Sequence, residues 1–224
     1  KNTDPKTIGD ELGVEAILNG RLVQRDEKLI LSLELINTAT ENVLWGDKYE
    51  RKASELVSLQ TEIAKDVSKR LKSDLSGADE ERVTKEYTAN AEAYQAYLKG
   101  RFYWNKRIGN NLKLAIEQFK VAADKDPNYA LAYVGLGDCY ALLNEYTGAS
   151  LSESSAQAKK FAERAIELDP QLGEPHATLG LIHKNLWRWK ESEREFKRAI
   201  ELSPKYATAY QWYYILLITL DRAD

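Results

Sequence analysis

The stretches AKKFAERAIELDP (residues 158–170) and SEREFKRAIELSP (residues 192–204) decide the fold of this chain. Their closing prolines, Pro170 and Pro204, lie 34 residues apart. A third version, AIEQFKVAADKDP, ends at Pro127. Self-similarity at a period near 34 residues is the sequence signature of a stacked repeat array. Each unit of such an array contacts only its neighbours, so the units together expose a long curved surface. The sequence therefore favours a binding scaffold.

Each repeat carries small and aromatic residues at fixed offsets before its proline. In the last complete unit these are Ser192, Phe196 and Ala199, followed by Pro204. A small residue at a helix crossing lets two backbones approach, and proline disfavours helix at the residue before it. We therefore expect seven helices in antiparallel pairs over residues 91–220, with loops near 107–111, 144–152 and 186–189.

These repeats resemble the tetratricopeptide repeat (TPR) family. The matching residues are Gly100, Tyr103, Ala115, Phe119, Ala122 and Pro127 in the first unit; Tyr133, Leu136, Gly137, Tyr140, Ala158, Ala162, Ala165 and Pro170 in the second; and Leu179, Gly180, Ser192, Phe196, Ala199 and Pro204 in the third. The resemblance implies an all-α solenoid of three and a half repeats, over residues 91–127, 128–170, 171–204 and 205–224. The second unit departs from the pattern, because an excess of nine residues falls around NEYTGASLSESS (residues 144–155).

Residues 1–77 show a different pattern, one that mixes α and β. Asp4-Pro5 is a helix-start signal and Gly13 suits the helix exit. The segments VEAILNGRLVQ (residues 14–24), KLILSLELIN (28–37) and NVLWGDKYE (42–50) are strand-like. Leucines alternate along one face of the second, while Val43, Trp45, Asp47 and Tyr49 share a face of the third. We expect an antiparallel three-stranded sheet over residues 14–50.

The period then changes from two residues to three or four. One stripe joins Leu56, Leu59, Ile63, Val67, Leu71 and Leu75. This pattern predicts an amphipathic helix over residues 54–75, with Ser54 as its cap, that packs on the leucine face of the sheet. The fold class is thus α+β, a small sheet with helices followed by a helical solenoid.

A polar stretch, residues 78–90, is the expected linker between the two regions. The region before it resembles the second half of a TolB-like amino-terminal domain, on the segments IGDELGVEAILNGRLVQRDEKLILSLELINTATENVLWGDKYER and LVSLQTEIAKDVSKRL. Such domains precede TPR arrays in bacterial signalling proteins, so the resemblance implies that context. The chain begins with Lys1 and contains no methionine, and we expect it to be a piece of a longer protein or a processed form.

The composition is that expected of a soluble globular protein. Of 224 residues, 43% are hydrophobic and 30% are charged, with a net charge of -3. That charge gives no bulk attraction to nucleic acid or to anionic lipid, so neither partner is expected. No stretch reaches the roughly 20 apolar residues of a membrane span. The single cysteine, Cys139, lies among packing positions and is expected to be buried and inert.

Catalytic and cofactor signatures are missing from the sequence. No GxxxxGK[ST], GxGxxG or GxSxG motif occurs. The two histidines, His176 and His183, are seven residues apart on one expected helix, without a third convergent ligand. We interpret them as core or groove-lining residues. The segment Tyr103–Arg107 mixes aromatic and basic residues, but it is a single patch on an acidic chain. We expect no enzyme activity, no cofactor and no metal.

The TPR resemblance also implies where a partner would bind. In that family the first helix of each pair lines a concave groove, and the corresponding residues here form the predicted groove set: Tyr97, Arg101, Trp104, Asn105, Asp138, Leu142, Leu181, Lys184, Asn185 and Gln211. Chaperone-binding members hold a peptide carboxylate with lysine, asparagine and arginine at five positions. Here those positions are Tyr97, Arg101, Gly135, Glu174 and Thr178, so that clamp is absent.

Two functions remain open at this point. The first is a protein or peptide interaction module within a larger bacterial signalling protein. The second is a structural role in which copies of the chain assemble through the sheet region or the last, partial repeat. Neither needs direct membrane contact. Both are compatible with the sequence, because an array of this kind presents apolar surface at its ends as well as in its groove.

Overall fold

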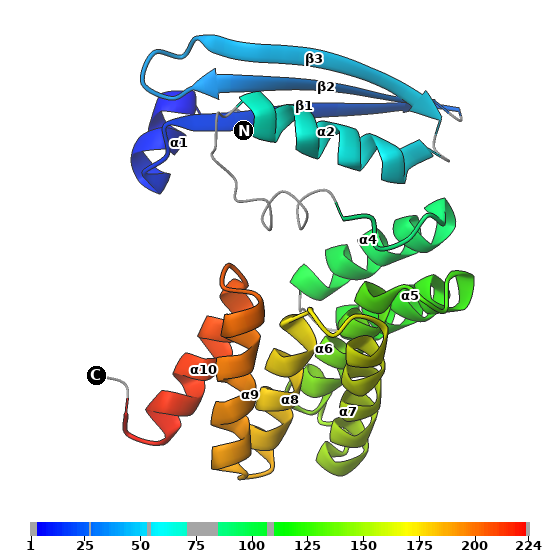
Figure 1. Ribbon diagram of the computed structural model, residues 1–224, viewed down its shortest axis with the longest axis vertical. Helices are drawn as coiled ribbons and strands as arrows, with labels where there is room; N and C mark the ends of the chain where they lie inside the picture. Colours follow the sequence, from blue (N-terminus) through cyan, green and yellow to red (C-terminus); the bar gives the residue numbers. More distant parts are fainter. Residues whose placement is uncertain (1–3, 27, 53–54, 71–84, 107–109, 223–224) are drawn as a thin grey trace. The chain divides into compact units, whose positions relative to one another are not determined.

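The structure is a computed structural model that describes residues 4–26, 28–52, 55–70, 85–106 and 110–222. The chain forms two compact units, residues 1–91 and residues 92–224 (Figure 1). The first holds a small antiparallel sheet with helices and the second a TPR-like helical solenoid. The α+β fold class expected from the sequence is therefore confirmed. In the described part of the chain, no helix has both the length and the apolar character needed to cross a membrane.

The first helix, α1 (Pro5–Leu12), begins and ends at the predicted signals. The Asp4 carboxylate accepts a hydrogen bond from the backbone N–H of Thr7 at 3.2 Å, and Pro5 occupies the first turn, where no amide partner is needed. Gly13 follows the helix in a left-handed conformation with φ of 63°. Both ends are thus set by local chemistry that can be recognised from the sequence.

The three predicted strands form one antiparallel sheet. They are β1 (Ala16–Arg25), β2 (Lys28–Asn37) and β3 (Val43–Lys52), in the order β1-β2-β3. The alternation along β2 places Leu29, Leu33 and Leu35 in buried positions. Since side chains alternate between faces with a period of two, these leucines lie on one face of the sheet.

Helix α2 (Leu56–Arg70) covers part of this leucine face. Its residue Leu59 joins Leu33, Leu35, Trp45 and Tyr49 in a buried cluster, and two further residues of its stripe, Ile63 and Val67, pack against that cluster. The predicted packing is confirmed for these residues. The expected cap Ser54, the stripe residues Leu71 and Leu75, and most of the expected linker lie outside the described residues.

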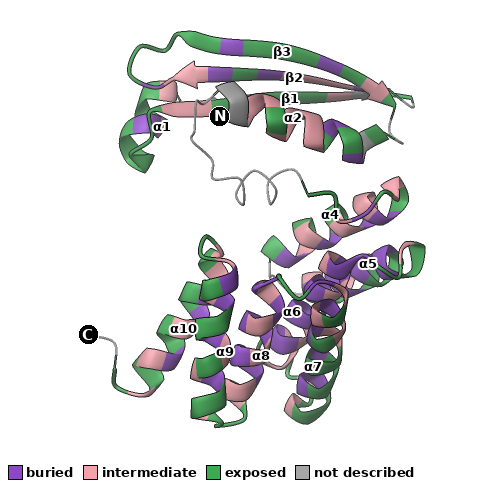
Figure 2. Cartoon of the chain, in the orientation of Figure 1, coloured by how far each residue is buried: buried purple, intermediate pink, exposed green. Residues whose placement is uncertain are grey.

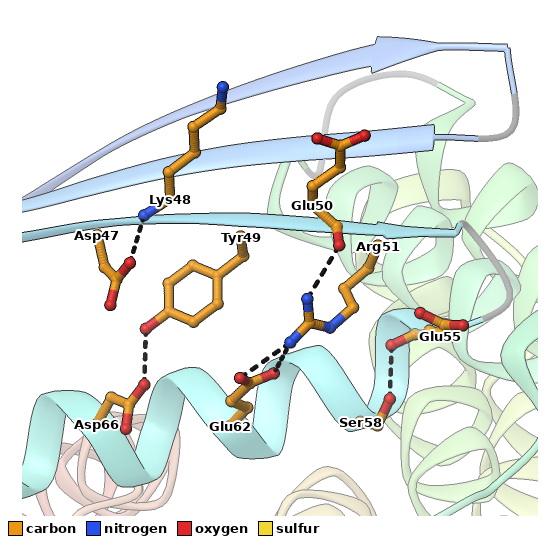
Figure 3. A network of polar contacts seen from close by, with 9 residues as sticks. All are labelled: Asp47, Lys48, Tyr49, Glu50, Arg51, Glu55, Ser58, Glu62 and Asp66. Atoms are coloured by element: carbon orange, nitrogen blue, oxygen red, sulfur yellow. Dashed lines mark hydrogen bonds and ion pairs between the residues drawn. The ribbon is translucent and has the colours of Figure 1, made fainter.

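The polar rim of α2 is joined to β3 by specific hydrogen bonds (Figure 3). The Tyr49 hydroxyl donates to Asp66 Oδ2 at 2.8 Å, and Arg51 donates to both carboxylate oxygens of Glu62 at 3.0 and 2.9 Å. Burial and the Asp66 carboxylate both raise the pKa of the Tyr49 phenol, which therefore stays protonated as a donor. These contacts fix the register of the helix on the sheet.

The β1 part of the same face is left open. Leu18 and Leu22 of β1 pair with Leu35 and Leu31 of β2, and directly opposed residues of a sheet share a face. Leu18 nevertheless remains 44% exposed and Leu22 58% exposed. The helix thus covers the face over β2 and β3 and leaves two leucines of β1 in contact with solvent.

The predicted face of β3 needs one correction. Val43 was expected to share a face with Trp45, Asp47 and Tyr49, but Val43 is 57% exposed while Trp45 and Tyr49 are buried. The pairing of β2 with β3 shifts between Leu35 and Ile36, so that Ile36 lies opposite Val43 while Leu35 lies opposite Trp45. The shift leaves one extra residue in β3, and such a β-bulge changes the face toward which the neighbouring side chains point. The alternation therefore holds from Trp45 onward.

The second compact unit, residues 92–224, consists of three antiparallel helix pairs followed by one further helix in the described part of the chain. The described helices are α4 (Ala91–Lys106), α5 (Asn111–Lys125), α6 (Ala130–Thr147), α7 (Leu151–Leu168), α8 (Glu174–Asn185), α9 (Trp189–Leu202) and α10 (Ala207–Thr219). These are the seven helices predicted between residues 91 and 220, and no strand interrupts the described part of that span. The extra residues of the second repeat lengthen α6 and α7 to 18 residues each and leave only three residues between them.

Close contacts between glycine and phenylalanine set the distance between paired helices. A Cβ atom on Gly180 of α8 would lie 2.8 Å from the ring of Phe196 of α9, and one on Gly100 of α4 would lie 2.5 Å from the ring of Phe119 of α5. Phe119 and Phe196 are fully buried. Figure 2 shows the buried residues concentrated along α6 and its neighbours in the solenoid. The glycines are required because a larger side chain would displace these rings.

Equivalent glycines of two repeats provide a matched test of this packing. Gly180→Ala should destabilise the protein by about 1–3 kcal/mol, because its new methyl group would overlap the ring of Phe196. Gly137→Ala should be neutral or stabilising by up to about 1 kcal/mol, because its nearest neighbours lie at 3.4–3.5 Å and alanine is the better helix former. Urea denaturation of both variants measures the difference. Equal effects at the two positions would contradict the packing described.

The Glu193 carboxylate, which joins α9 to Arg222 after α10, should make the stability of the protein depend on pH. Hydrogen bonds from Arg222 and Lys197 lower the pKa of Glu193 to about 2 from its usual 4.5. This group therefore contributes stability above about pH 5 and loses it as the pH falls from 4.5 toward 2. Glu193→Gln should cost about 1 kcal/mol at pH 7, and the difference from wild type should shrink below pH 4.5. Denaturation at several pH values, with Glu163→Gln as the exposed-pair control, checks this; a difference that does not vary with pH would contradict it.

Candidate functional site

The predicted groove residues divide into three groups by burial. Trp104, Asp138, Leu142 and Leu181 are buried within the helix packing. Tyr97, Arg101, Lys184 and Asn185 are half-buried, while Asn105 and Gln211 are exposed. A partner can therefore reach the last six directly, and the first four can act only by supporting them.

A buried polar network links the first helices of the repeats. Asp138 of α6 is fully buried, and its Oδ1 accepts a 2.6 Å hydrogen bond from the hydroxyl of Thr178 on α8. Its Oδ2 lies 3.5 Å from the hydroxyl of Tyr206, which precedes α10, and 4.0 Å from Nη1 of Arg101 on α4. One carboxylate thus contacts side chains from three other segments.

The contact between Arg101 and Asp138 reveals how the repeats align. Each of these residues directly follows the glycine of its own repeat, Gly100 or Gly137, so the two occupy equivalent positions. Their contact shows that side chains from equivalent positions of α4 and α6 meet. The guanidinium of Arg101 also lies 4.6 Å from the ring centroid of Trp104. The arginine is therefore held by a carboxylate and an aromatic ring while part of it remains accessible.

Two tyrosines flank this network and stay protonated. Burial raises the pKa of Tyr97 to about 12, partly offset by the charge of Arg101. Burial and the charge of Asp138 together raise the pKa of Tyr206 well above its usual value. The ring of Tyr97 packs against Phe119 and Tyr129 at centroid distances of 5.7 and 5.2 Å. Both phenols therefore act as neutral groups at physiological pH.

Sequence reasoning did not place Thr178 and Tyr206 in this network. Thr178 was considered only as a position of the absent carboxylate clamp, although it is a lone hydroxyl residue in the apolar run ATLGLI (residues 177–182). Tyr206 stands two residues after Pro204, as Tyr129 stands two residues after Pro127. This repeated spacing is a signal that could have identified the residue.

The histidines and the cysteine take part in packing. His176 Nδ1 lies 2.8 Å from Glu195 Oε2, which joins α8 to α9. Burial lowers the pKa of His183, so it is neutral at physiological pH. Cys139 is fully buried, as expected. Within the described ranges, no group of three histidine, cysteine, aspartate or glutamate side chains is placed to hold a metal ion.

Comparison with known proteins gives relatives of limited similarity. No family model matches the chain. The chain is 27% identical, over 196 residues, to "Putative adenylate cyclase 3" of Rhizobium meliloti (strain 1021), a match that covers 86% of this chain. It spans 33% of the length of that relative.

Similar solved structures include TPR domains. The first TPR domain of Spaghetti (RPAP3), bound to the HSP90 peptide SRMEEVD, is 18% identical, with a TM-score of 0.45 and coverage of 58% of this chain and 94% of the other. The structure of MamA is also 18% identical, with a TM-score of 0.44 and coverage of 67% and 88%.

Removing the buried carboxylate should destabilise the solenoid strongly. We expect Asp138→Ala to cost about 3 kcal/mol, because Arg101 loses its counter-charge and the Thr178 hydroxyl loses its acceptor. Asp124→Ala, at an exposed position of α5, should change the free energy of unfolding by less than about 0.5 kcal/mol. Urea denaturation provides both values. A similar small effect of both substitutions would show that the network does not hold the helices.

Proposed function

We propose that this chain is a non-catalytic protein interaction module that binds a peptide or an extended protein segment along its first helices. The observation that carries this proposal is the side-by-side contact of Arg101 and Asp138 from equivalent positions of α4 and α6. It supports a continuous wall built from one face of each first helix. The accessible side chains on that wall are of two kinds. Arg101 and Lys184 are basic, and Asn105, Asn185 and Gln211 carry amides.

The mixture of groups on this wall suits recognition of backbone and carboxylate groups. Arg101 and Lys184 donate hydrogen bonds to anionic acceptors, and the amides of Asn105, Asn185 and Gln211 can pair with the peptide backbone of an extended segment. Arg101 is already oriented by Asp138 and Trp104, so little side-chain entropy is lost when a ligand binds. The first TPR domain of Spaghetti (RPAP3), one of the similar solved structures, is bound to a peptide.

We propose a bacterial signalling context for the module. The similarity to the Rhizobium meliloti protein over most of this chain supports that context, and so does the resemblance of residues 1–77 to a TolB-like domain. The domains would be a TolB-like unit (residues 1–77), a linker (78–90) and the TPR array (91–224). In this arrangement any catalytic activity of the whole protein belongs to other segments, and this chain contributes recognition.

A second candidate function is self-assembly, and a specific observation favours it. Leu18 and Leu22 are exposed on β1, which is an edge strand of the described sheet. Exposed edges with apolar side chains recruit further strands. On α10, Tyr210, Tyr214 and Ile218 are also exposed. Light scattering over a concentration series separates the two candidates, since a constant monomeric mass excludes self-assembly.

Selection of binding peptides tests the proposed groove. Peptides selected on the wild-type chain from a random library should lose at least about tenfold in affinity for a triple variant, Asn105→Ala with Lys184→Ala and Gln211→Ala. These side chains are accessible, so the variant should keep its stability. A control variant replaces Lys159, Arg164 and Arg198, which are on α7 and α9, with alanine. If the selected peptides bind both variants equally, the groove is not the binding site.

A further inference from the structure

The turn between α8 and α9 carries an exposed tryptophan, Trp187, whose ring meets that of the half-buried Trp189 at the start of α9. Trp187 is 75% exposed, and its neighbour Leu186 is also exposed. The ring of Trp187 meets the ring of Trp189 edge-on at a centroid distance of 5.2 Å. We name residues 186–190 the tryptophan tip. A side chain of this size, left in water at the end of a helix pair, adds almost nothing to the burial of apolar surface.

The backbone conformation at Trp187 is unfavourable for a bulky residue such as tryptophan. Its φ is 61°, in the left-handed region. The same conformation occurs at Asp221, 34 residues later and therefore one repeat on, and at Gly148 after α6. Glycine and aspartate tolerate positive φ, whereas bulky residues do not. Trp187 thus occupies a turn position that favours glycine, and neither burial nor backbone preference accounts for it.

The positive charge of this region is concentrated at the tip. Arg188 and Lys190 are exposed, and neither makes an ion pair within the described part of the chain. The cations farther along α9 are paired: Arg194 with Glu195, Lys197 with Glu193 and Arg198 with Glu201. The tip therefore combines the exposed ring of Trp187 with two cations that make no ion pair among the described residues, while the three cations farther along α9 are all paired.

We propose that the tryptophan tip binds the surface of a bilayer that contains anionic phospholipids. Tryptophan prefers the interface between water and hydrocarbon, because its ring is apolar and its N–H is polar. Arg188 and Lys190 lie beside it, where they can pair with lipid phosphates and carboxylates. This inference goes beyond the proposed groove function and does not depend on it.

The local charge outweighs the expectation drawn from the whole chain. A net charge of -3 argued against lipid contact, but a bilayer touches only the part of a protein that faces it. Screening limits the influence of distant charges to about 10 Å. An extended single-stranded nucleic acid, the other ligand that stacks on tryptophan, would follow the surface past the acidic residues Glu191 and Glu195. A flat headgroup layer needs to contact only the exposed side chains of Trp187, Arg188 and Lys190, and not the length of α9 toward Glu195.

Vesicle binding by the 224-residue chain tests the proposal. The chain should sediment with vesicles of phosphatidylcholine and phosphatidylserine at low salt, and much less with phosphatidylcholine alone or at high salt. Trp187→Gly should lower the partition constant by about tenfold or more. It should also keep or raise the melting temperature, since glycine suits the positive φ. Arg188→Glu with Lys190→Glu should weaken binding by about tenfold or more as well.

Matched controls separate the tip from general effects. Arg164→Glu with Arg198→Glu makes the same change in net charge on α7 and α9, and Tyr214→Ala removes an exposed aromatic ring from α10. Both controls should bind vesicles as wild type does. The proposal is wrong if wild type fails to bind at low salt, or if the controls lose as much binding as the tip variants. It is also wrong if poly-glutamate or single-stranded DNA binds through the tip while vesicles do not.

Discussion

The wall formed by the first helices of the repeats depends on the contacts of one buried carboxylate, that of Asp138. A charge removed from water is tolerated only when other groups solvate it, and here they come from three separate segments: Arg101 of α4, Thr178 of α8 and Tyr206 before α10. The carboxylate therefore fixes how consecutive repeats stack, because any slip between them would leave it without partners. Networks of this kind specify one arrangement more than they add stability.

The same arrangement supports the proposed role of this wall in binding. Arg101 is anchored at one end by the carboxylate and along its plane by Trp104, so its remaining N–H groups have a fixed direction. The surrounding amides are free to adapt. A rigid cation beside adaptable polar groups is a suitable combination for extended chains, whose backbone is constant while side chains vary.

Most of the fold could be predicted from the sequence, because it rests on local signals. The Asp4-Pro5 cap acts within a few residues of itself, whereas the prolines and the small residues at helix crossings recur with the period of the helix pairs. Each is found where expected. The alternation along β2 likewise placed the leucine face correctly. The face on which Val43 lies was predicted wrongly, because it depends on the pairing of β3 with β2, which no local sequence pattern reveals.

The candidate site was predicted less completely. The alignment of repeats identified Arg101 and Asp138 as members of one wall, but as independent contacts for a ligand. Their mutual contact, and the roles of Thr178 and Tyr206, depend on the stacking of segments up to 68 residues apart. The exposure of Trp187 was also missed. The pattern of the repeat does not reveal that the Trp187 side chain is 75% exposed, because this depends on the fold of the turn between α8 and α9.

One aromatic ring has a consequence for how the solenoid unfolds. The ring of Phe119 is approached both by Gly100 of α4 and by Gly135 of α6, at 2.5 and 2.6 Å from the Cβ position of each. A single side chain thus belongs to the cores of two consecutive repeats. In arrays whose repeats meet only at their surfaces, units can melt one after another from an end. The first two repeats here lack a plane along which they could part, so they should open as one cooperative block.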